Sequence, residues 1–359
     1  MRRTALALSA LLALGAGPTP PKAPEKPLSR IAFGSCLGQD LPQPIWARVL
    51  ASRPELFVFL GDNVYSDTDD MKLLRAAYAK LGAQPGFQSL KKAVPILATW
   101  DDHDYGFNDS GSEFPAKEAS KQVFLDFFGA PADSPRRTRS GIYDARTFGP
   151  PGKRVQVILL DTRYNRSPLQ WQEGGEDKDE GGRYVPTTDT TTTLLGAEQW
   201  AWLEGVLQEP AQIRIFASSI QVVNVDVGGE KWANFPHERK RLFDLLWKNR
   251  ITGALFISGD RHLAELSVMD GDIGYPVFDL TSSSLNWAEQ RWRHIDSNRH
   301  RIGLVSRGDN FGLIEIEWDR TDPLVRLKII DVDGDLVLHY KVDLSTLREG
   351  NLEWWLGEK

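Results

Sequence analysis

Short apolar runs that end abruptly in polar or glycine residues are the feature of this sequence that most restricts its fold. They are rich in β-branched and aromatic residues and predict buried strands at 31–33, 56–60, 95–99, 155–160, 213–217 and 255–258. Apolar residues at three- and four-residue spacing between them predict helices at 71–80, 117–128, 196–207 and 238–249. This alternation predicts a layered α/β domain.

The C-terminal part has a different pattern. Residues 311–318, 324–331 and 336–342 alternate apolar and polar side chains, as antiparallel strands do, and Asp333-Gly334 is a favourable hairpin turn. We expect these strands to complete a second sheet. The polar stretch at 165–193 has no periodicity, which predicts a mobile loop or lid.

The N-terminus predicts export. Arg2 and Arg3 precede an apolar run at 5–16 that is too short to span a bilayer, which is typical of a signal peptide, here residues 1–17. An extended tether at 18–29 and one domain at 30–359 would follow, with no transmembrane segment. We therefore expect a periplasmic or secreted protein, exported by either the Sec or the twin-arginine route. A net charge of -6 argues against a protein that coats nucleic acid.

Residue types that bind metals follow four of the predicted strands. Loops at the carboxyl ends of strands converge in open α/β sheets, so these side chains are expected to meet. The segments are Gly34-Ser35-Cys36, Gly61-Asp62-Asn63-Val64-Tyr65, Trp100-Asp101-Asp102-His103-Asp104 and Ser258-Gly259-Asp260-Arg261-His262. Burying so many anionic groups together is unfavourable without a cation, so the sequence predicts a metal site.

The donor types indicate two unlike metals. The thiolate of Cys36 and the phenolate of Tyr65 suit a Lewis-acidic transition metal such as Fe(III), whereas the carboxylates suit Ca2+, Mg2+ or Mn2+. Cys36 is the single cysteine of the chain, so no intramolecular disulfide is possible. Taken alone, such a cysteine is more often a buried small apolar side chain, and its place among the other motifs is what favours ligation.

These ordered motifs resemble the PhoD-like alkaline phosphatases of the calcineurin-like metallophosphoesterase superfamily. The similarity continues through 160–166 and 195–203 and covers about residues 30–320. It implies a layered metallophosphoesterase fold, in which two mixed β-sheets pack face to face and helices flank them. It also implies hydrolysis of phosphate esters by a hydroxide that two metal ions activate.

The resemblance implies a role for each matching residue. Ligands of ferric iron match Cys36, Tyr65 and His262; the bridging carboxylate matches Asp62; ligands of the second ion, Ca2+ in the family, match Asp102 and Asp260. Two features depart from the superfamily pattern: asparagine is usual where this chain has Asp102, and no histidine lies near residues 218–221. The identity of the second metal therefore stays open between Ca2+, Mg2+ and Mn2+.

The neighbouring residues suggest the remaining catalytic roles. His103 is the candidate general acid for the leaving alkoxide, and Asp104 is expected to orient it. Arg163, just after a predicted strand, is expected to bind the phosphate oxygens with its guanidinium, and Arg166 to assist it. Surface ion pairing is the alternative for both arginines.

Hydrolysis of phosphate monoesters is the first functional hypothesis, and phosphodiesterase or phospholipase-like activity on the same site is the alternative. The substrate would be a small-molecule or lipid phosphate ester, and the protein a monomer. A non-catalytic metal-binding envelope protein is a more remote alternative. A serine hydrolase is disfavoured, because the sequence has no Gly-x-Ser-x-Gly elbow.

Overall fold

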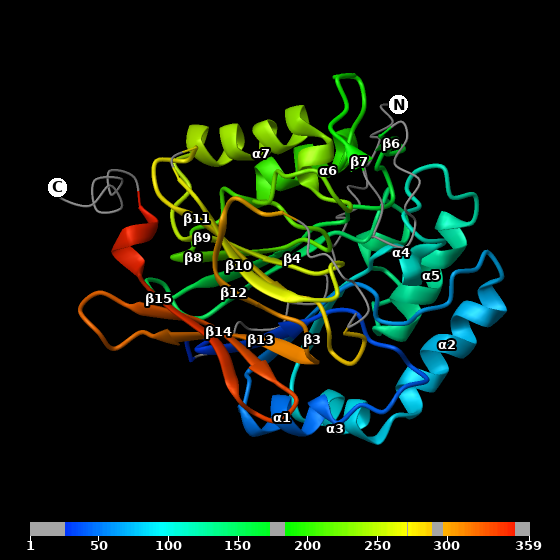
Figure 1. The fold of residues 1–359 in the computed structure, drawn as a ribbon, viewed down its shortest axis with the longest axis horizontal. Coiled ribbons are helices and arrows are strands. Elements are labelled where there is room, and N and C mark those ends of the chain that lie inside the picture. Colours follow the sequence, from blue (N-terminus) through cyan, green and yellow to red (C-terminus); the bar gives the residue numbers. More distant parts are fainter. Residues whose placement is uncertain (1–25, 173–183, 271, 289–296, 349–359) are drawn as a thin grey trace, which may run out of the picture.

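Two mixed β-sheets pack face to face in the computed structural model, which describes residues 26–172, 184–270, 272–288 and 297–348 (Figure 1). The six-stranded sheet has the order β15-β14-β13-β1-β2-β3, formed by Leu336–Asp343, Leu324–Asp331, Asn310–Glu317, Arg30–Gly34, Leu56–Leu60 and Ile96–Thr99. The seven-stranded sheet has the order β12-β10-β11-β9-β8-β5-β4, formed by Arg301–Ser306, Ala264–Met269, Val277–Ser282, Ala254–Ser258, Ile213–Ala217, Val155–Leu159 and Asp144–Phe148. The fold class expected from the sequence is confirmed.

Helices cover the outer face of each sheet (Figure 1). The six-stranded sheet is covered by α1 (Ile45–Ala51), α2 (Met71–Ala83), α3 (Pro85–Ala93) and α5 (Lys117–Phe127). The seven-stranded sheet is covered by α6 (Gly196–Val206) and α7 (Pro236–Lys248). Single turns lie at α4 (Asp102–Tyr105), η1 (Pro135–Arg137), η3 (Trp232–Asn234) and η4 (Leu344–Leu347).

The central strands are apolar on both faces, which explains their continuous hydrophobic runs. Successive side chains of a strand point to opposite faces, so in β2 Leu56 and Val58 join the core between the sheets. Phe57 and Phe59 of the same strand join the second core, beneath the helices, where Trp46 of α1 packs edge-on against both rings. Parallel strands buried on both faces have this pattern, rather than an alternation of apolar and polar residues.

The strands and helices predicted from the sequence are confirmed to within a few residues at their ends. The C-terminal strands complete the sheet with which the chain begins, because β13 pairs antiparallel with β1, opposing Ile31 to Ile314. The stretch at 165–193 contains a short hairpin formed by β6 (Gln170–Trp171) and β7 (Tyr184–Val185). The predicted signal peptide at 1–17, and most of the predicted tether, lie outside the described residues.

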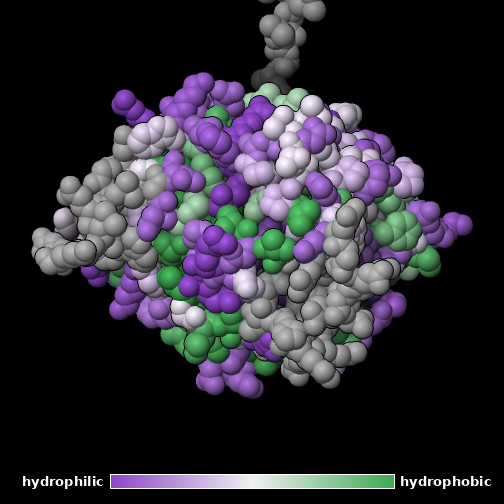
Figure 2. All heavy atoms as spheres, turned by 45° about the horizontal axis from the view of Figure 1, so that its top comes forward, coloured by the Kyte–Doolittle hydropathy of each residue, from purple (hydrophilic) through white to green (hydrophobic). Residues whose placement is uncertain are grey.

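The surface carries hydrophilic and hydrophobic side chains side by side on the face seen in Figure 2. Such mixing is the ordinary state of a folded chain, because more than half of a protein's accessible surface is apolar. Within the described ranges, no helix has both the length and the apolar character needed to cross a bilayer.

A tight contact between β1 and β13 generates a stability prediction. A Cβ at Gly312 would lie 2.1 Å from the ring of Phe33, its partner on β1, whereas a Cβ at Gly205 of α6 would meet nothing within 4 Å. We expect Gly312→Ala to lower the free energy of unfolding by about 1–3 kcal/mol, because the ring has to move within a packed core. The matched control, Gly205→Ala, should be neutral or stabilising by up to about 1 kcal/mol. Equal urea midpoints for the two variants would contradict this account.

Candidate metal centre

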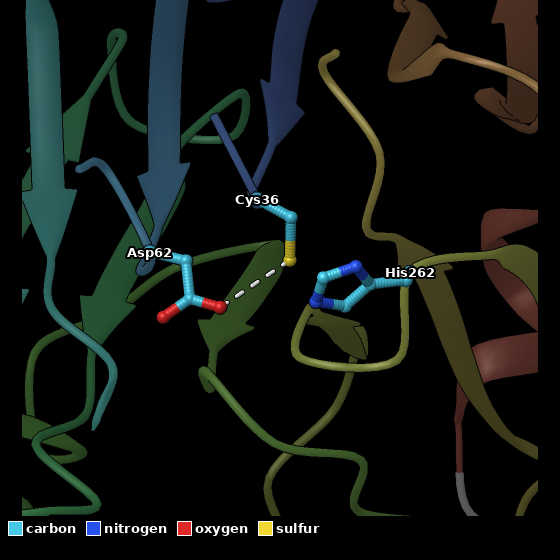
Figure 3. A group of neighbouring side chains, drawn as sticks. All are labelled: Cys36, Asp62 and His262. Atoms are coloured by element: carbon cyan, nitrogen blue, oxygen red, sulfur yellow. Dashed lines mark hydrogen bonds between the residues drawn. The ribbon is translucent and has the colours of Figure 1, made fainter. Parts of the chain in front are cut away.

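The candidate site residues sit at sharp turns directly after the strands. Cys36, Asp62, Asp260 and His262 have φ angles of 58°, 49°, 69° and 53°, in the left-handed region that residues other than glycine rarely adopt. Each such residue costs about 1–3 kcal/mol and persists only when the surrounding structure enforces it. The turns after β1, β2 and β9 aim Cys36, Asp62 and His262 toward one another (Figure 3).

Among the residues that the structure describes, three overlapping groups of side chains hold metal-ligating atoms within 4.8 Å of one another. The groups are Cys36, Asp62 and His262; Asp62, Asp102 and His103; and Asp101, Asp102 and Asp260. Asp62 belongs to the first two groups and Asp102 to the last two, so the ligand atoms form one continuous set. Thus the structure brings residues from four separate turns to one edge of the sandwich, as the strand-end pattern predicted.

Cys36 is fully buried and surrounded by polar groups. Its Sγ lies 3.1 Å from the Ser283 hydroxyl and 3.5 Å from Oδ2 of Asp62. Burial alone would raise the pKa of the thiol, but the nearby His262 and hydrogen bonds from Ser283 and Ser35 outweigh it and lower the pKa to about 6. Cys36 is therefore poised as a thiolate, the form that binds metals.

Tyr65 completes this half of the site. Its hydroxyl lies 3.4 Å from Oδ2 of Asp62 and 3.3 Å from Nε2 of His262. The ring stacks on Trp287 with a centroid separation of 4.4 Å and an interplanar angle of 17°. Burial, followed by the charges of Cys36 and Asp62, raises the pKa of Tyr65 well above its usual value, so a phenolate here requires a neighbouring cation.

The carboxylate half of the site has buried oxygen atoms without hydrogen bonds. Oδ2 of Asp101 and Oδ1 of Asp102 are buried and accept no hydrogen bond from any residue that the structure describes, although Nη2 of Arg163 lies 3.6 Å from Oδ1 of Asp102. Burial is the main cause that raises the pKa of Asp260 to about 8; the charges of Asp101 and Asp102 add to it, and the charge of Arg261 opposes it. Burial and the charge of Asp102 likewise raise the pKa of Asp62. A hard cation among these oxygens would satisfy them and remove the repulsion, so the donor set fits a metal.

His103 projects from α4 into the same region, but Asp104 does not orient it. Its Nδ1 lies 2.8 Å from Oδ1 of Asp67, which is therefore its carboxylate partner. The expectation for Asp104 was wrong, because that side chain points into the core and accepts hydrogen bonds from Asn63 and the Tyr78 hydroxyl, at 2.6 and 2.9 Å. Burial opposes protonation of His103, but Asp102 and Asp67 outweigh it and raise its pKa to about 10.

Arg163 and Arg166 are fully buried, which corrects the expectation that they contact phosphate. Nε of Arg163 lies 2.5 Å from Asp101, and its Nη1 lies 2.5 Å from Glu230. Nε of Arg166 lies 2.9 Å from the other oxygen of Glu230, and its Nη1 donates to the carbonyl oxygen of Ser167. The two guanidinium groups are thus engaged in holding the backbone and the acidic residues of the site. Surface ion pairing, the alternative, is wrong too, because both pairs are buried.

A cavity of about 590 Å³ opens onto the site and is bordered by Asp62, Asp102, His103, Asp260 and His262. Arg261 also lines it, and its Nη1 lies 3.3 Å from Oδ2 of Asp260. Sequence reasoning did not assign a role to Arg261, although it lies between two predicted ligands. Asp67 and Glu230 were missed as well, and no motif marks either of them. No histidine joins the site from 218–221, where the Ser219 hydroxyl instead donates to Asp101 at 2.6 Å.

The buried ion pair of Arg163 and Glu230 predicts that Arg163 stabilises the fold and does not bind substrate. We expect Arg163→Met to lower the free energy of unfolding by about 3–5 kcal/mol, because Asp101 and Glu230 lose a buried counter-charge. Arg75→Met, which breaks an exposed ion pair with Asp126 at 3.3 Å, should cost at most about 1 kcal/mol. Urea unfolding measures both variants. Unchanged stability of Arg163→Met would contradict the structural role.

Comparisons with known proteins agree with this geometry. A curated relative, alkaline phosphatase D of Bacillus subtilis (strain 168), is 22% identical over 304 residues, which are 73% of this chain and 50% of that protein. The chain therefore spans half the length of this relative. A solved PhoD structure superposes with a TM-score of 0.69 at 17% identity, covering 92% of this chain and 73% of that one. GAP50, the anchor in the inner membrane complex of Plasmodium, superposes with a TM-score of 0.57 at 15% identity, covering 91% of each chain.

At these identities the solved structures establish a shared fold alone, and a fold by itself does not fix a function. The family assignment comes from the sequence. A sequence model of the PhoD-like phosphatases matches residues 31–287, most of the chain, and this range contains every turn that contributes to the metal-ligand cluster. The chain belongs to the PhoD-like phosphatase family.

Proposed function

We propose that this protein is a metal-dependent phosphoesterase that hydrolyses phosphate monoesters, with phosphodiesters or phospholipids as the alternative substrates of the same site. The observation that carries the proposal is the continuous set of ligand atoms around Asp62 and Asp102, which opens into the cavity that His103 lines. A volume of about 590 Å³ falls in the range of small-molecule sites.

The donor chemistry supports two different cations. Iron(III) would be held by Cys36, Tyr65 and His262, because sulfur, phenolate and imidazole suit a transition metal. Asp102 and Asp260 would hold Ca2+, or Mg2+ or Mn2+, because hard divalent ions prefer carboxylate oxygens, and Asp62 would bridge the two ions. Bound cations of this kind polarise a phosphoryl group and lower the pKa of a coordinated water molecule.

His103 would then act as the proton donor for the leaving alkoxide. Its imidazolium form is stabilised by Asp102 and Asp67, and a protonated imidazole at the cavity wall can donate to the ester oxygen as the P–O bond breaks. Asp67 is a positioning residue, because its contact at Nδ1 leaves Nε2 to carry the transferred proton. The guanidinium of Arg261, on the same wall, would stabilise negative charge on the phosphoryl oxygens.

A non-catalytic metal-binding protein is the remote alternative. It is considered because a protein described as an anchor has a similar fold. The pairing of His103 with Asp67 favours catalysis, because metal binding alone does not require a proton donor. We also propose that residues 1–17 direct export to the periplasm or the medium, that residues 18–29 form a tether, and that 30–359 fold as one monomeric domain.

Removal of the metals tests the function directly. We expect a chelator to abolish hydrolysis of monoester and diester substrates and metal addition to restore it, because the carboxylates hold no substrate without a cation. In the same preparations Cys36→Ser and Tyr65→Phe should lose transition metal, and any visible charge-transfer absorption, more than they lose the second ion. Elemental analysis and absorption spectra measure both.

The matched control is Tyr340→Phe, in β15, a tyrosine that packs on Phe278 away from the site. It should retain both metals and full activity. Turnover that persists after all metal has been removed would refute the proposed function, and wild-type iron content in Cys36→Ser and Tyr65→Phe would refute the ligand assignment.

The proton-donor role predicts a specific dependence on leaving group and pH. His103→Gln should lower kcat by about 10²–10⁴-fold for an alkyl phosphate and by much less for p-nitrophenyl phosphate, whose leaving group needs no proton. The active imidazolium is present below a pKa of about 10 and is lost as the pH rises through it. Asp67→Asn removes an interaction that raises this pKa, so the basic limb of kcat should move to lower pH.

The control for this pH profile is Asp40→Asn, which breaks an exposed ion pair with Lys80 at 2.7 Å and should leave the profile unchanged. An equal loss of kcat on both leaving groups in His103→Gln would argue against proton donation.

A further inference from the structure

One wall of the cavity is apolar, and none of the residues that form it has a role in the proposed catalytic mechanism. Pro168, Leu169 and Trp171 line it together with Tyr184, so the short β6–β7 hairpin faces the same space as His103. Trp171 is 50% exposed, an unusual position for the largest apolar side chain. Asp260, Arg261 and His262 also line the cavity and supply charged and metal-ligating groups.

The apolar wall is fixed in place rather than loosely attached. The ring of Trp171 packs on Tyr184 at a centroid separation of 4.5 Å, and Tyr184 is itself buried. The Tyr184 hydroxyl donates to Oδ2 of Asp109 at 2.6 Å, and its backbone N–H donates to the carbonyl oxygen of Gly228 at 3.0 Å. These contacts hold the exposed side chain of Trp171 in one position. It therefore loses little conformational entropy when a ligand binds to it.

Asp109 connects this wall to the candidate metal centre. Its backbone N–H donates to Oδ2 of Asp102 at 2.7 Å, while its carboxylate accepts from Tyr184. His103 lies only six residues before Asp109 on the same segment, and both line the cavity. A leaving group that receives its proton from His103 therefore departs along the wall formed by this segment and the hairpin.

The charges on this side of the cavity restrict what the leaving group can be. Asp109 and Glu113 both line the cavity, and His103, the cation on the same segment, becomes neutral when it gives its proton to the leaving group. A second anionic group on the alcohol would meet like charge here, whereas an uncharged apolar group would cover the exposed face of Trp171 and remove it from water.

We infer that Trp171, with Leu169 and Pro168, is the subsite for the alcohol part of the ester, and that this part is an uncharged apolar group, aromatic or aliphatic. The inference deepens the proposed phosphoesterase function and rests on it. Trp171 is a specificity-determining residue in this scheme: it contacts the leaving group and leaves the phosphoryl chemistry to the metal-binding side.

The test compares metal-loaded wild type and Trp171→Ala on 1-naphthyl phosphate and glycerol phosphate. Each variant is compared with wild type on the same substrate, so intrinsic reactivity cancels. We expect Trp171→Ala to lower kcat/KM about tenfold for the naphthyl ester and less than about twofold for glycerol phosphate, as loss of an apolar contact does. Trp171→Phe should recover most of the loss. Trp247→Ala, a 49% exposed tryptophan of α7 outside the cavity, should change neither value.

Calorimetric binding of naphthylphosphonate and methylphosphonate to the same proteins separates the two hypotheses. We expect Trp171→Ala to weaken naphthylphosphonate binding about tenfold and to leave methylphosphonate binding unchanged, which would support the subsite. This result would support the subsite even if the protein hydrolysed no ester. The absence of hydrolysis would refute only the proposed function. Equal effects of Trp171→Ala on both substrates and both phosphonates, or no effect on any, would overturn the subsite and leave the phosphoesterase proposal intact.

Discussion

The repulsion among buried anionic groups at one edge of the sandwich is the constraint on which the site depends. Asp62, Asp102 and Asp260 come from three different strand-end turns and lie in contiguous groups with the thiol of Cys36. Burial and mutual repulsion raise the pKa of Asp62 and Asp260, so the protein alone cannot keep all of these groups charged. A cation resolves the conflict, and folding and metal binding should therefore be coupled in this family member.

The backbone is strained at the turns that bring the ligands together, and the two packed sheets hold these turns in place. Cys36, Asp62 and Asp260 have left-handed backbone conformations, and each lies two residues after the end of a buried strand. Gly61, at a φ of 106°, permits the turn after β2 to pack against the turn after β3, because a Cβ there would lie 2.4 Å from that of Asp101. Both cores must be intact for the ligands to meet, since β1 and β2 belong to one sheet and β9 to the other.

The sequence predicted the parts of the site that follow from local pattern. Strand ends are visible as apolar runs followed by Asp62 or Asp260, and carboxyl ends of strands converge by a general rule. The side-chain partners were not predictable in this way. Asp104 directly follows His103 in the sequence and Asp67 lies 36 residues before it, yet Asp67 contacts the imidazole while Asp104 accepts from the Tyr78 hydroxyl. Arg163 follows a strand as a phosphate ligand would, but Glu230, 67 residues further along, holds it in the interior.

In the proposed scheme, the metal-binding residues and the leaving-group wall belong to different parts of this chain. The candidate ligands stand on turns that directly follow strands buried on both faces, so the ligand positions depend on how those strands pack in the two cores. The hairpin that carries Trp171 is linked to the ligand set through Asp109. The Asp109 carboxylate accepts a hydrogen bond from Tyr184, and its backbone N–H donates to Asp102. Changes in 168–171 can therefore alter the shape of the leaving-group wall without moving Asp62 or Cys36. The proposed scheme thus lets the leaving-group wall change without a change in the metal-binding residues, because separate sets of contacts hold the two.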